Sequence, residues 1–252
     1  MTAINPPLRG FQPFFRKELS EWWRRRAALV VFLAVGGLGT LGTLATRIDE
    51  LLGGVPTAGM LDPTANVLGA LFNQWILFAG IFASIGMLTQ ERALGTLAWT
   101  LSKPISRASV LFAKWTAAVA VLAIVAVALP LALSVGVATW SYGSAPDLGS
   151  VARFGLVLLA LPAFFVALNL ALATRINSQA AIAAIALGVL GTPYVIGGFV
   201  PAVAELWPSS IADMAVPVAM GDPVNLPTLA SWAIALVGLG IAALVLFNRE
   251  DM

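Results

Sequence analysis

The 252-residue sequence contains no cysteine and no histidine, and only 10% of its residues are charged. Without cysteine, the chain has no disulfide framework, no thiolate zinc site and no cysteine nucleophile. The absence of histidine removes the commonest general base and the commonest imidazole metal ligand. The sequence also lacks a Gly-x-x-x-x-Gly-Lys-Ser/Thr loop for holding nucleotide phosphates. We therefore expect no catalytic residue, no metal site and no cofactor-binding site in this chain.

Apolar residues dominate the sequence. They make up 60% of it, and the mean hydropathy is +0.93, whereas a soluble domain has about 45–50% apolar and about 25% charged residues. Six stretches of at least 20 residues carry no charge: 27–46, 63–90, 115–146, 154–174, 176–204 and 223–248. About 20 apolar residues cross a bilayer as a helix, and the runs do not alternate as barrel strands do.

These stretches predict an all-α, polytopic membrane protein with six transmembrane helices in a single domain over residues 1–252. The expected spans are about 27–45, 67–89, 112–139, 154–174, 178–199 and 228–247. An even number of spans places both termini on one side of the membrane. Twelve of the fourteen Lys and Arg residues then share that side, and only Arg47 and Arg153 lie opposite. Positive charge marks the cytoplasmic side, so we expect cytoplasmic termini and no nucleic-acid partner.

Residues 11–26 have the pattern of an amphipathic helix. Phe11, Phe14, Leu19 and Trp22 recur at helical spacing, and basic residues occupy the other face. Such a basic helix with aromatic residues lies in the membrane interface. Two interpretations remain open: a topological anchor for the first span, or an elbow helix that also contacts a cytoplasmic partner.

The loop between the second and third spans, residues 91–107, predicts a short amphipathic helix on the cytoplasmic surface. Leu94, Leu97 and Leu101 share one helical face, and Pro104 ends the helix. We expect Glu91 at the amino-terminal end of this helix, where the helix dipole favours an anion. Glu91 and Arg107 bracket the helix with opposite charges, which predicts that they pair with each other or with a partner protein.

The motif Glu-x-x-x-Gly-Thr at 91–96, followed by Leu-Ser-x-Pro-Ile-Ser-Arg at 101–107, resembles the permease subunits of ABC-2 type transporters. The opening Phe-Arg-Lys-Glu-Leu segment is similar to the first helix of that family. The resemblance implies a half-transporter that pairs with a second permease subunit, as a homo- or heterodimer. It also implies a separate ATP-binding-cassette ATPase that binds ATP and Mg, export as the direction, and the cell membrane of a bacterium or archaeon as the location.

The same resemblance assigns an ATPase-coupling role to the loop. Its expected members are Glu91, Arg92, Gly95, Thr96, Trp99, Ser102, Pro104 and Arg107. A secondary transporter and a non-transporting membrane anchor subunit are the alternatives. Both are disfavoured, the first because no ionisable residue lies in the middle of a span.

Two further sets of residues in the spans suggest helix contacts. Asn73, Gln74 and Asn169 are polar residues that either join helices or line a pathway. Ala180, Ala184, Gly188 and Thr192 recur every four residues and form a ridge that lets another backbone approach closely. The sequence leaves open whether the helix on this ridge belongs to the same subunit or to a second one.

Overall fold

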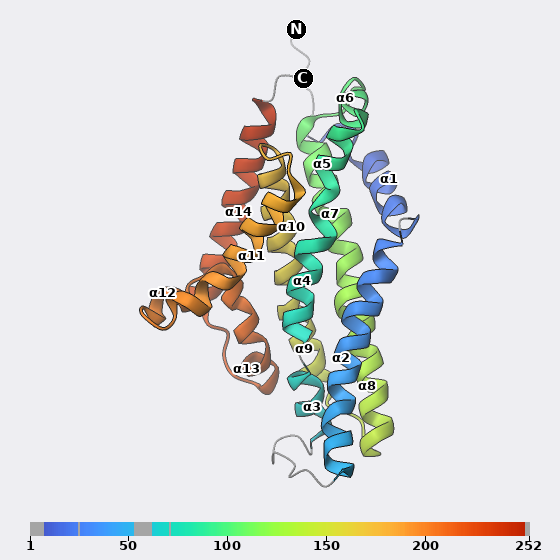
Figure 1. Ribbon diagram of the computed structural model, residues 1–252, viewed down its shortest axis with the longest axis vertical. Helices are drawn as coiled ribbons and strands as arrows, with labels where there is room; N and C mark the ends of the chain where they lie inside the picture. The colour runs from blue at the N-terminus through green and yellow to red at the C-terminus, as the bar shows by residue number, and fades with distance from the viewer. Residues whose placement is uncertain (1–7, 25, 53–61, 71, 250–252) are drawn as a thin grey trace.

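A computed structural model describes residues 8–24, 26–52, 62–70 and 72–249, without the side chains of Thr46, Glu50, Asn73 and Gln74. These residues form a bundle of helices, with no strand among them (Figure 1). The α-helices are α1 (Phe11–Arg24), α2 (Ala27–Leu51), α3 (Pro63–Gly69), α4 (Phe72–Ser84), α5 (Gly86–Ala93), α6 (Thr96–Leu101), α7 (Arg107–Leu122), α8 (Leu129–Tyr142), α9 (Leu148–Leu158), α10 (Ala160–Ala173), α11 (Gln179–Ile196), α12 (Pro201–Glu205), α13 (Ala215–Met220) and α14 (Leu226–Asn248). A π-helix, η2 (Ala123–Ala128), joins α7 to α8, and a 3₁₀-helix, η3 (Pro208–Met214), precedes α13.

Within the described ranges, five helical segments are long and apolar enough to cross a membrane: Ala27–Asp49, Arg107–Tyr142, Leu148–Ala173, Gln179–Ile196 and Leu226–Asn248. The second predicted span is not one of them, because the chain there is divided among α3, α4 and α5. These three helices nevertheless follow one another along the bundle, with α3 and α4 beside α2 and α5 at the level of α1 (Figure 1).

The break between α4 and α5 lies where side chains compete for backbone carbonyls. Ser84 Oγ donates to the carbonyl of Gly80 at 2.6 Å, and Asn169 Nδ2 of α10 donates to the carbonyl of Ile81 at 2.8 Å. The Ile81 carbonyl is the acceptor that the next helical turn uses in an uninterrupted helix. Polar groups that insert into this ladder interrupt or bend a helix. Charge spacing alone does not reveal this interruption.

Two transmembrane segments begin earlier than the sequence predicted. The third begins at Arg107, where the Ser106 hydroxyl accepts a hydrogen bond from the backbone of Ser109 and caps α7. The fourth begins at Leu148, where the Asp147 carboxylate accepts bonds from the backbone of Gly149 and Ser150. Side-chain caps of this kind stabilise a helix start. The charged residues that follow the caps are therefore part of the helices.

Prolines account for the irregular stretches inside two segments. Pro130 lacks an N–H and its ring crowds the preceding turn, and the wider π turn of η2 lies immediately before it. Pro162 occupies the first turn of α10, directly after the chain leaves α9. Both segments continue across the bundle despite these interruptions (Figure 1).

Helix α10 forms the centre of the bundle. Twelve of its fourteen residues are buried, which matches a helix that is apolar all round. It packs against α4, α7 and α14. By contrast, α14 exposes Ile234, Val237 and Ile241. An apolar outer surface over helices of this length suits contact with lipid.

Helix α1 packs against α7 and ends next to the start of α2. It places Phe14 and Trp22 in the interior, together with the carboxylate of Glu18. The end of α14, α1 and α6 lie at the same end of the bundle (Figure 1).

We expect Gly39→Ala to lower the free energy of unfolding by about 1–3 kcal/mol, the usual cost of overpacking a core. A Cβ atom at Gly39 overlaps the buried Phe72 ring, so α2 and α4 must separate. Gly37→Ala is the matched control, because nothing lies within 4 Å of a Cβ atom at Gly37. Thermal unfolding in detergent measures both variants, and equal effects at the two glycines would contradict this account.

Candidate functional site

The loop of residues 91–107, named the connector from here on, changes direction at Gly95. This glycine has a φ of +69°, a left-handed conformation that side chains with a Cβ rarely adopt. The turn separates α5 from α6, and the Thr96 hydroxyl donates to the Glu91 carbonyl across it at 3.2 Å. After α6, Ser102 Oγ donates to the Trp99 carbonyl at 2.8 Å, and Pro104 lies in the stretch that leads to α7.

The connector contains a short helix, as expected, but Glu91 is not at its beginning. Glu91 lies in the last turns of α5, and the connector helix α6 starts only at Thr96. The left-handed turn at Gly95 explains the difference, because it ends α5 before a new helix begins. The expectation that the dipole of the connector helix stabilises Glu91 was therefore wrong.

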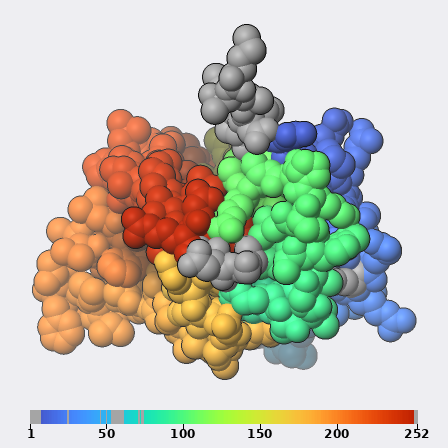
Figure 2. All heavy atoms as spheres, turned by 90° about the horizontal axis from the view of Figure 1, so that it is seen from above, coloured from blue at the N-terminus to red at the C-terminus, as the bar shows by residue number. Residues whose placement is uncertain are grey.

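The apolar face of the connector is also divided. Leu97 is buried and Leu101 is half-buried against the bundle. Leu94 precedes the turn instead of belonging to α6, and it is 74% exposed. Trp99 is 64% exposed, and the Lys103 ammonium lies 3.5 Å from the centre of its ring. Seen from this end of the molecule, the connector forms part of the surface beside α14 (Figure 2).

Glu91 belongs to a buried group of charges that joins three helices. The Lys114 ammonium of α7 lies 2.9 Å from Glu91 Oε1 of α5 and 3.0 Å from Glu18 Oε1 of α1. The exposed fractions are 1% for Lys114, 4% for Glu18 and 5% for Glu91. Opposite charges this close in a poorly hydrated place attract strongly and hold their helices together.

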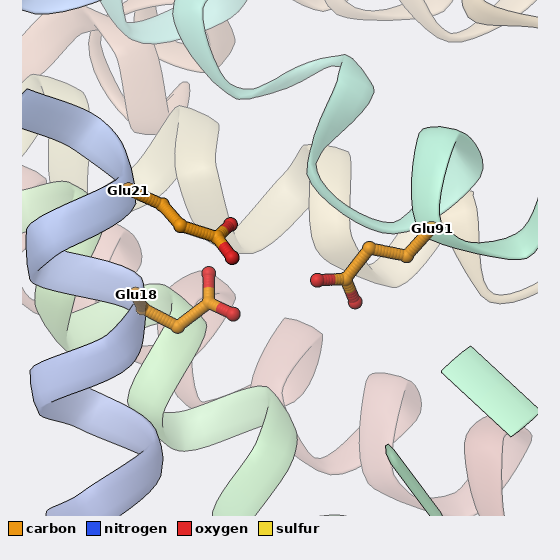
Figure 3. Close-up of side chains that lie close together, drawn as sticks. All are labelled: Glu18, Glu21 and Glu91. Atoms are coloured by element: carbon orange, nitrogen blue, oxygen red, sulfur yellow. The ribbon is translucent and has the colours of Figure 1, made fainter. Parts of the chain in front are cut away.

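Lys17 and Glu21 of α1 extend this group toward the surface. Lys17 Nζ lies 3.4 Å from Glu91 Oε1 and 3.3 Å from Glu21 Oε1. Burial lowers the pKa of Lys17, but the carboxylates of Glu91, Glu18 and Glu21 together raise that pKa above its ordinary value. We call Lys17, Glu18, Glu21, Glu91 and Lys114 the charge cluster. Figure 3 shows its three carboxylates, which point toward one another from α1 and α5.

The same carboxylates are spaced closely enough to hold a metal ion. One oxygen from each of Glu18, Glu21 and Glu91 lies within 4.8 Å of the others. The ammonium of Lys114 already contacts two of these groups. A divalent cation between them is repelled by that ammonium. The residues therefore do not fit a metal centre.

Arg92 and Arg107 fasten the connector to two other helices. Arg92 Nη1 donates to the Ala173 carbonyl at 2.8 Å, at the carboxyl end of α10. Arg107 Nη1 donates to the carbonyls of Phe247 and Asn248 at 2.6 and 3.0 Å, at the carboxyl end of α14. Cations stabilise the last carbonyls of a helix. Glu91 and Arg107 therefore do not pair with each other, and their pairing with a partner protein stays a prediction.

A comparison with protein families adds an independent finding. The model described as "ABC-2 family transporter protein" matches residues 15–236. The chain belongs to the ABC-2 transporter family. A search of curated proteins finds no match. Family membership and the long apolar helices together show that this chain is a membrane transport permease.

In this permease, the predicted polar residues have different surroundings. Asn169 is fully buried, and its Nδ2 donates to the Ile81 carbonyl and to Ser84 Oγ, each at 2.8 Å. It therefore joins α10 to α4. The side chains of Asn73 and Gln74 lie outside the described part of the structure.

The predicted ridge on α11 lies on the surface of the permease. Ala180, Ala184 and Gly188 are exposed, and Thr192 is half-buried. Nothing lies within 4 Å of a Cβ atom at Gly188. No helix in the described part of this subunit covers the ridge at that position.

Lys17, Glu18 and Lys114 were not among the predicted site residues. Lys114 was treated as the charge that bounds the uncharged stretch 115–146, although the Ser106 cap starts α7 two turns before it. That cap was a usable signal, because a lysine two turns inside a membrane helix requires a partner. Its partners were not readable, since they are distant in sequence and meet only when α1 and α5 pack against α7.

Proposed function

We propose that this chain is one half of an ABC transporter, a permease subunit that forms half of the translocation pathway. A separate ATPase subunit binds ATP and Mg and drives it, since this sequence has no P-loop. The proposed direction is export, across the cell membrane of a bacterium or archaeon. The proposed domain is a single one that spans residues 1–252.

The observation that carries this proposal is that the connector is exposed at its tip and attached to several helices. Trp99 and Leu94, at the tip of the connector, are exposed on the surface of the subunit. Residues at the two ends of the connector bind other helices. Arg92 binds the end of α10, Arg107 binds the end of α14, and Glu91 binds Lys114 of α7. A partner that moves the tip therefore moves several helices together.

The sharpest test is a cross-link between the connector and the ATPase. Thr96→Cys and Trp99→Cys, each carrying a thiol-linked photo-cross-linker, are expected to capture a P-loop protein in membranes of the native host. Trp140→Cys is the matched control, because Trp140 is 81% exposed at the end of α8 that lies far from the connector (Figure 1). Capture by neither connector position, or equal capture at position 140, overturns the proposal.

We further propose six spans, with α4 and α5 together as the second, and both termini in the cytoplasm. The prediction is that an impermeant maleimide labels Ser144→Cys and Asp213→Cys in intact cells but leaves Ser102→Cys unlabelled. The excess of Lys and Arg on the side of the connector is the physical reason. The chain has no native cysteine, so each label reports one site. Labelling of Ser102→Cys in intact cells would show that the orientation is the reverse of the proposed one.

The proposed partner across the exposed ridge of α11 is a second permease subunit. We expect Gly188→Leu to break up the dimer, because the added side chain separates two closely packed backbones. Gly238→Leu on α14 is the control, since a Cβ atom there also meets open space. Size-exclusion chromatography with light scattering of the purified variants measures the change. A dimer that persists in Gly188→Leu shows that the ridge is not the subunit contact.

A further inference from the structure

The outer side of α1 and the turn that follows it carry charge of one sign. Arg16 and Arg24 are exposed on α1, and Arg26 is exposed directly before α2. The two carboxylates of α1, those of Glu18 and Glu21, belong to the charge cluster and point toward α5 (Figure 3). Among the described residues, no carboxylate forms an ion pair with any of the three arginines. This surface therefore attracts anions.

The aromatic face of α1 is directed into the bundle. Phe14 and Trp22 are buried, and Phe11, Phe15 and Leu19 pack against the core. An amphipathic helix that rests on a membrane turns its apolar face to the acyl chains, whereas α1 turns that face to α7. Contact between α1 and the membrane therefore needs residues outside the aromatic face.

The first residues of α2 show where the membrane surface lies. Leu29, Val30 and Leu33 are exposed on the first segment that is long and apolar enough to cross a membrane. Apolar side chains exposed on such a helix suit contact with acyl chains. The backbone N–H of Val30 donates to the Arg26 carbonyl at 2.9 Å, so Arg26 precedes these residues by one helical turn, which is about 5 Å. Arg26 therefore lies where acyl chains give way to headgroups.

Trp23 adds an aromatic side chain next to these cations. It is exposed in the last turn of α1, beside Arg24. Tryptophan side chains concentrate where headgroups meet acyl chains. Guanidinium groups form paired, charge-assisted hydrogen bonds with phosphate oxygens. An exposed indole with two arginines at this level therefore suits phospholipid headgroups that have a net negative charge.

The side of the bundle on which these residues lie also favours lipid. Helix α1 and the start of α2 lie on the opposite side from α11 and α12, both in the side view and in the end view (Figures 1 and 2). The second permease subunit proposed for the α11 ridge therefore leaves α1 facing the bilayer. This step rests on the proposed function, whereas the charge of the surface and its level in the membrane do not.

We infer that Trp23, Arg24 and Arg26, named the headgroup surface from here on, bind an anionic phospholipid. The lipid phosphate accepts hydrogen bonds from Arg24 and Arg26, and the acyl chains lie along Leu29 and Leu33 of α2. An acidic surface on the ATPase is a different partner for the same cations. The apolar residues exposed one turn away favour the membrane, and the experiment separates the two partners.

The test measures lipid binding to the purified full-length permease in detergent by native mass spectrometry. Phosphatidylglycerol is the anionic probe, and phosphatidylcholine with the same acyl chains is the neutral reference. We expect phosphatidylglycerol to bind more tightly. Arg24→Gln combined with Arg26→Gln should raise the Kd of phosphatidylglycerol about 30-fold, because each arginine near the headgroup contributes about a fivefold factor. Raising the ionic strength should weaken phosphatidylglycerol binding to the unaltered protein, because salt screens exposed charges.

Arg16→Gln combined with Lys103→Gln is the matched control, because it removes the same amount of charge from exposed positions outside the headgroup surface. Arg16 precedes Arg24 by eight residues, about 12 Å along the helix, which exceeds the screening length of about 8 Å at physiological salt. We expect this control to change the Kd about twofold or less. Arg24→Lys combined with Arg26→Lys keeps the charge and should keep most of the affinity. Thermal unfolding in phosphatidylcholine nanodiscs should be the same for all these variants, since they alter exposed side chains.

Equal affinity of the unaltered permease for the two lipids overturns the inference, as does an equal loss of phosphatidylglycerol binding in the matched control. If Arg24→Gln with Arg26→Gln leaves phosphatidylglycerol binding unchanged but weakens binding of the purified ATPase, the surface docks the ATPase and the inference is wrong. Because the lipid measurement contains no ATPase, its failure leaves the connector cross-link unaffected, and failure of the cross-link leaves lipid binding unaffected.

Discussion

Lys114→Met is expected to lower the free energy of unfolding by about 3–5 kcal/mol, the usual cost of removing one partner from a buried ion pair. Lys114 is 1% exposed and contacts Glu18 and Glu91, which are themselves buried. Without the ammonium, two buried carboxylates face each other, and Lys17 is the cation among the described residues that still contacts them. The ion pairs that link α1 and α5 to α7 are then lost.

The measurement is thermal unfolding of the purified permease in detergent or nanodiscs. The triple variant Lys114→Met, Glu18→Gln and Glu91→Gln should recover most of the loss, because it leaves no uncompensated charge in this place. Lys103→Met on the exposed connector is the single-lysine control and should change stability little. If Lys114→Met is as stable as Lys103→Met, the charge cluster does not hold the three helices together.

Trp99→Ala is expected to weaken association with the ATPase about 30-fold, as truncation of an aromatic residue that anchors an interface does. Trp99 is 64% exposed, and its ring is held by the Lys103 ammonium at 3.5 Å. A large, pre-positioned aromatic side chain at an exposed tip suits a pocket on a partner protein. Since little of the ring is buried in this subunit, the permease itself should fold and insert normally.

Binding of the purified ATPase to the permease in nanodiscs measures this effect, together with permease-stimulated ATP hydrolysis. Trp140→Ala is the matched control, because this tryptophan is still more exposed and lies at the opposite end of the bundle. We expect it to leave both quantities unchanged. Unaltered affinity in Trp99→Ala would mean that the ATPase docks elsewhere on the permease.

The sequence located much of the candidate site, but it did not show how the residues of the site are arranged. The motif at 91–107 and the resemblance to ABC-2 permeases directed attention to the connector, and the family match agrees with that resemblance. The pattern did not reveal the left-handed turn at Gly95, so Glu91 was assigned to the wrong helix. A glycine is compatible with a helix interior as well as with a helix end, and spacing alone does not distinguish the two.

The spacing of residues in the sequence did not identify the partners of the connector residues. Arg92 binds a carbonyl 81 residues away, and Arg107 binds one 140 residues away. Both of these acceptors are main-chain groups, which every residue possesses, although Arg92 also donates to the side chain of Asn177 after the end of α10. A main-chain acceptor carries no residue type by which the sequence could mark it as the place where an arginine binds.

The sequence by itself determined that this is a helical membrane protein with long apolar spans. That property is local: each uncharged stretch is long enough for a bilayer by its own length and composition. Only the tertiary structure decided that the second predicted span is broken, that Lys114 joins Glu18 and Glu91, and that the aromatic face of α1 packs into the bundle. These features depend on which faces of distant helices meet, because the free energy of a buried charge or an inserted polar group depends on the neighbours that packing supplies.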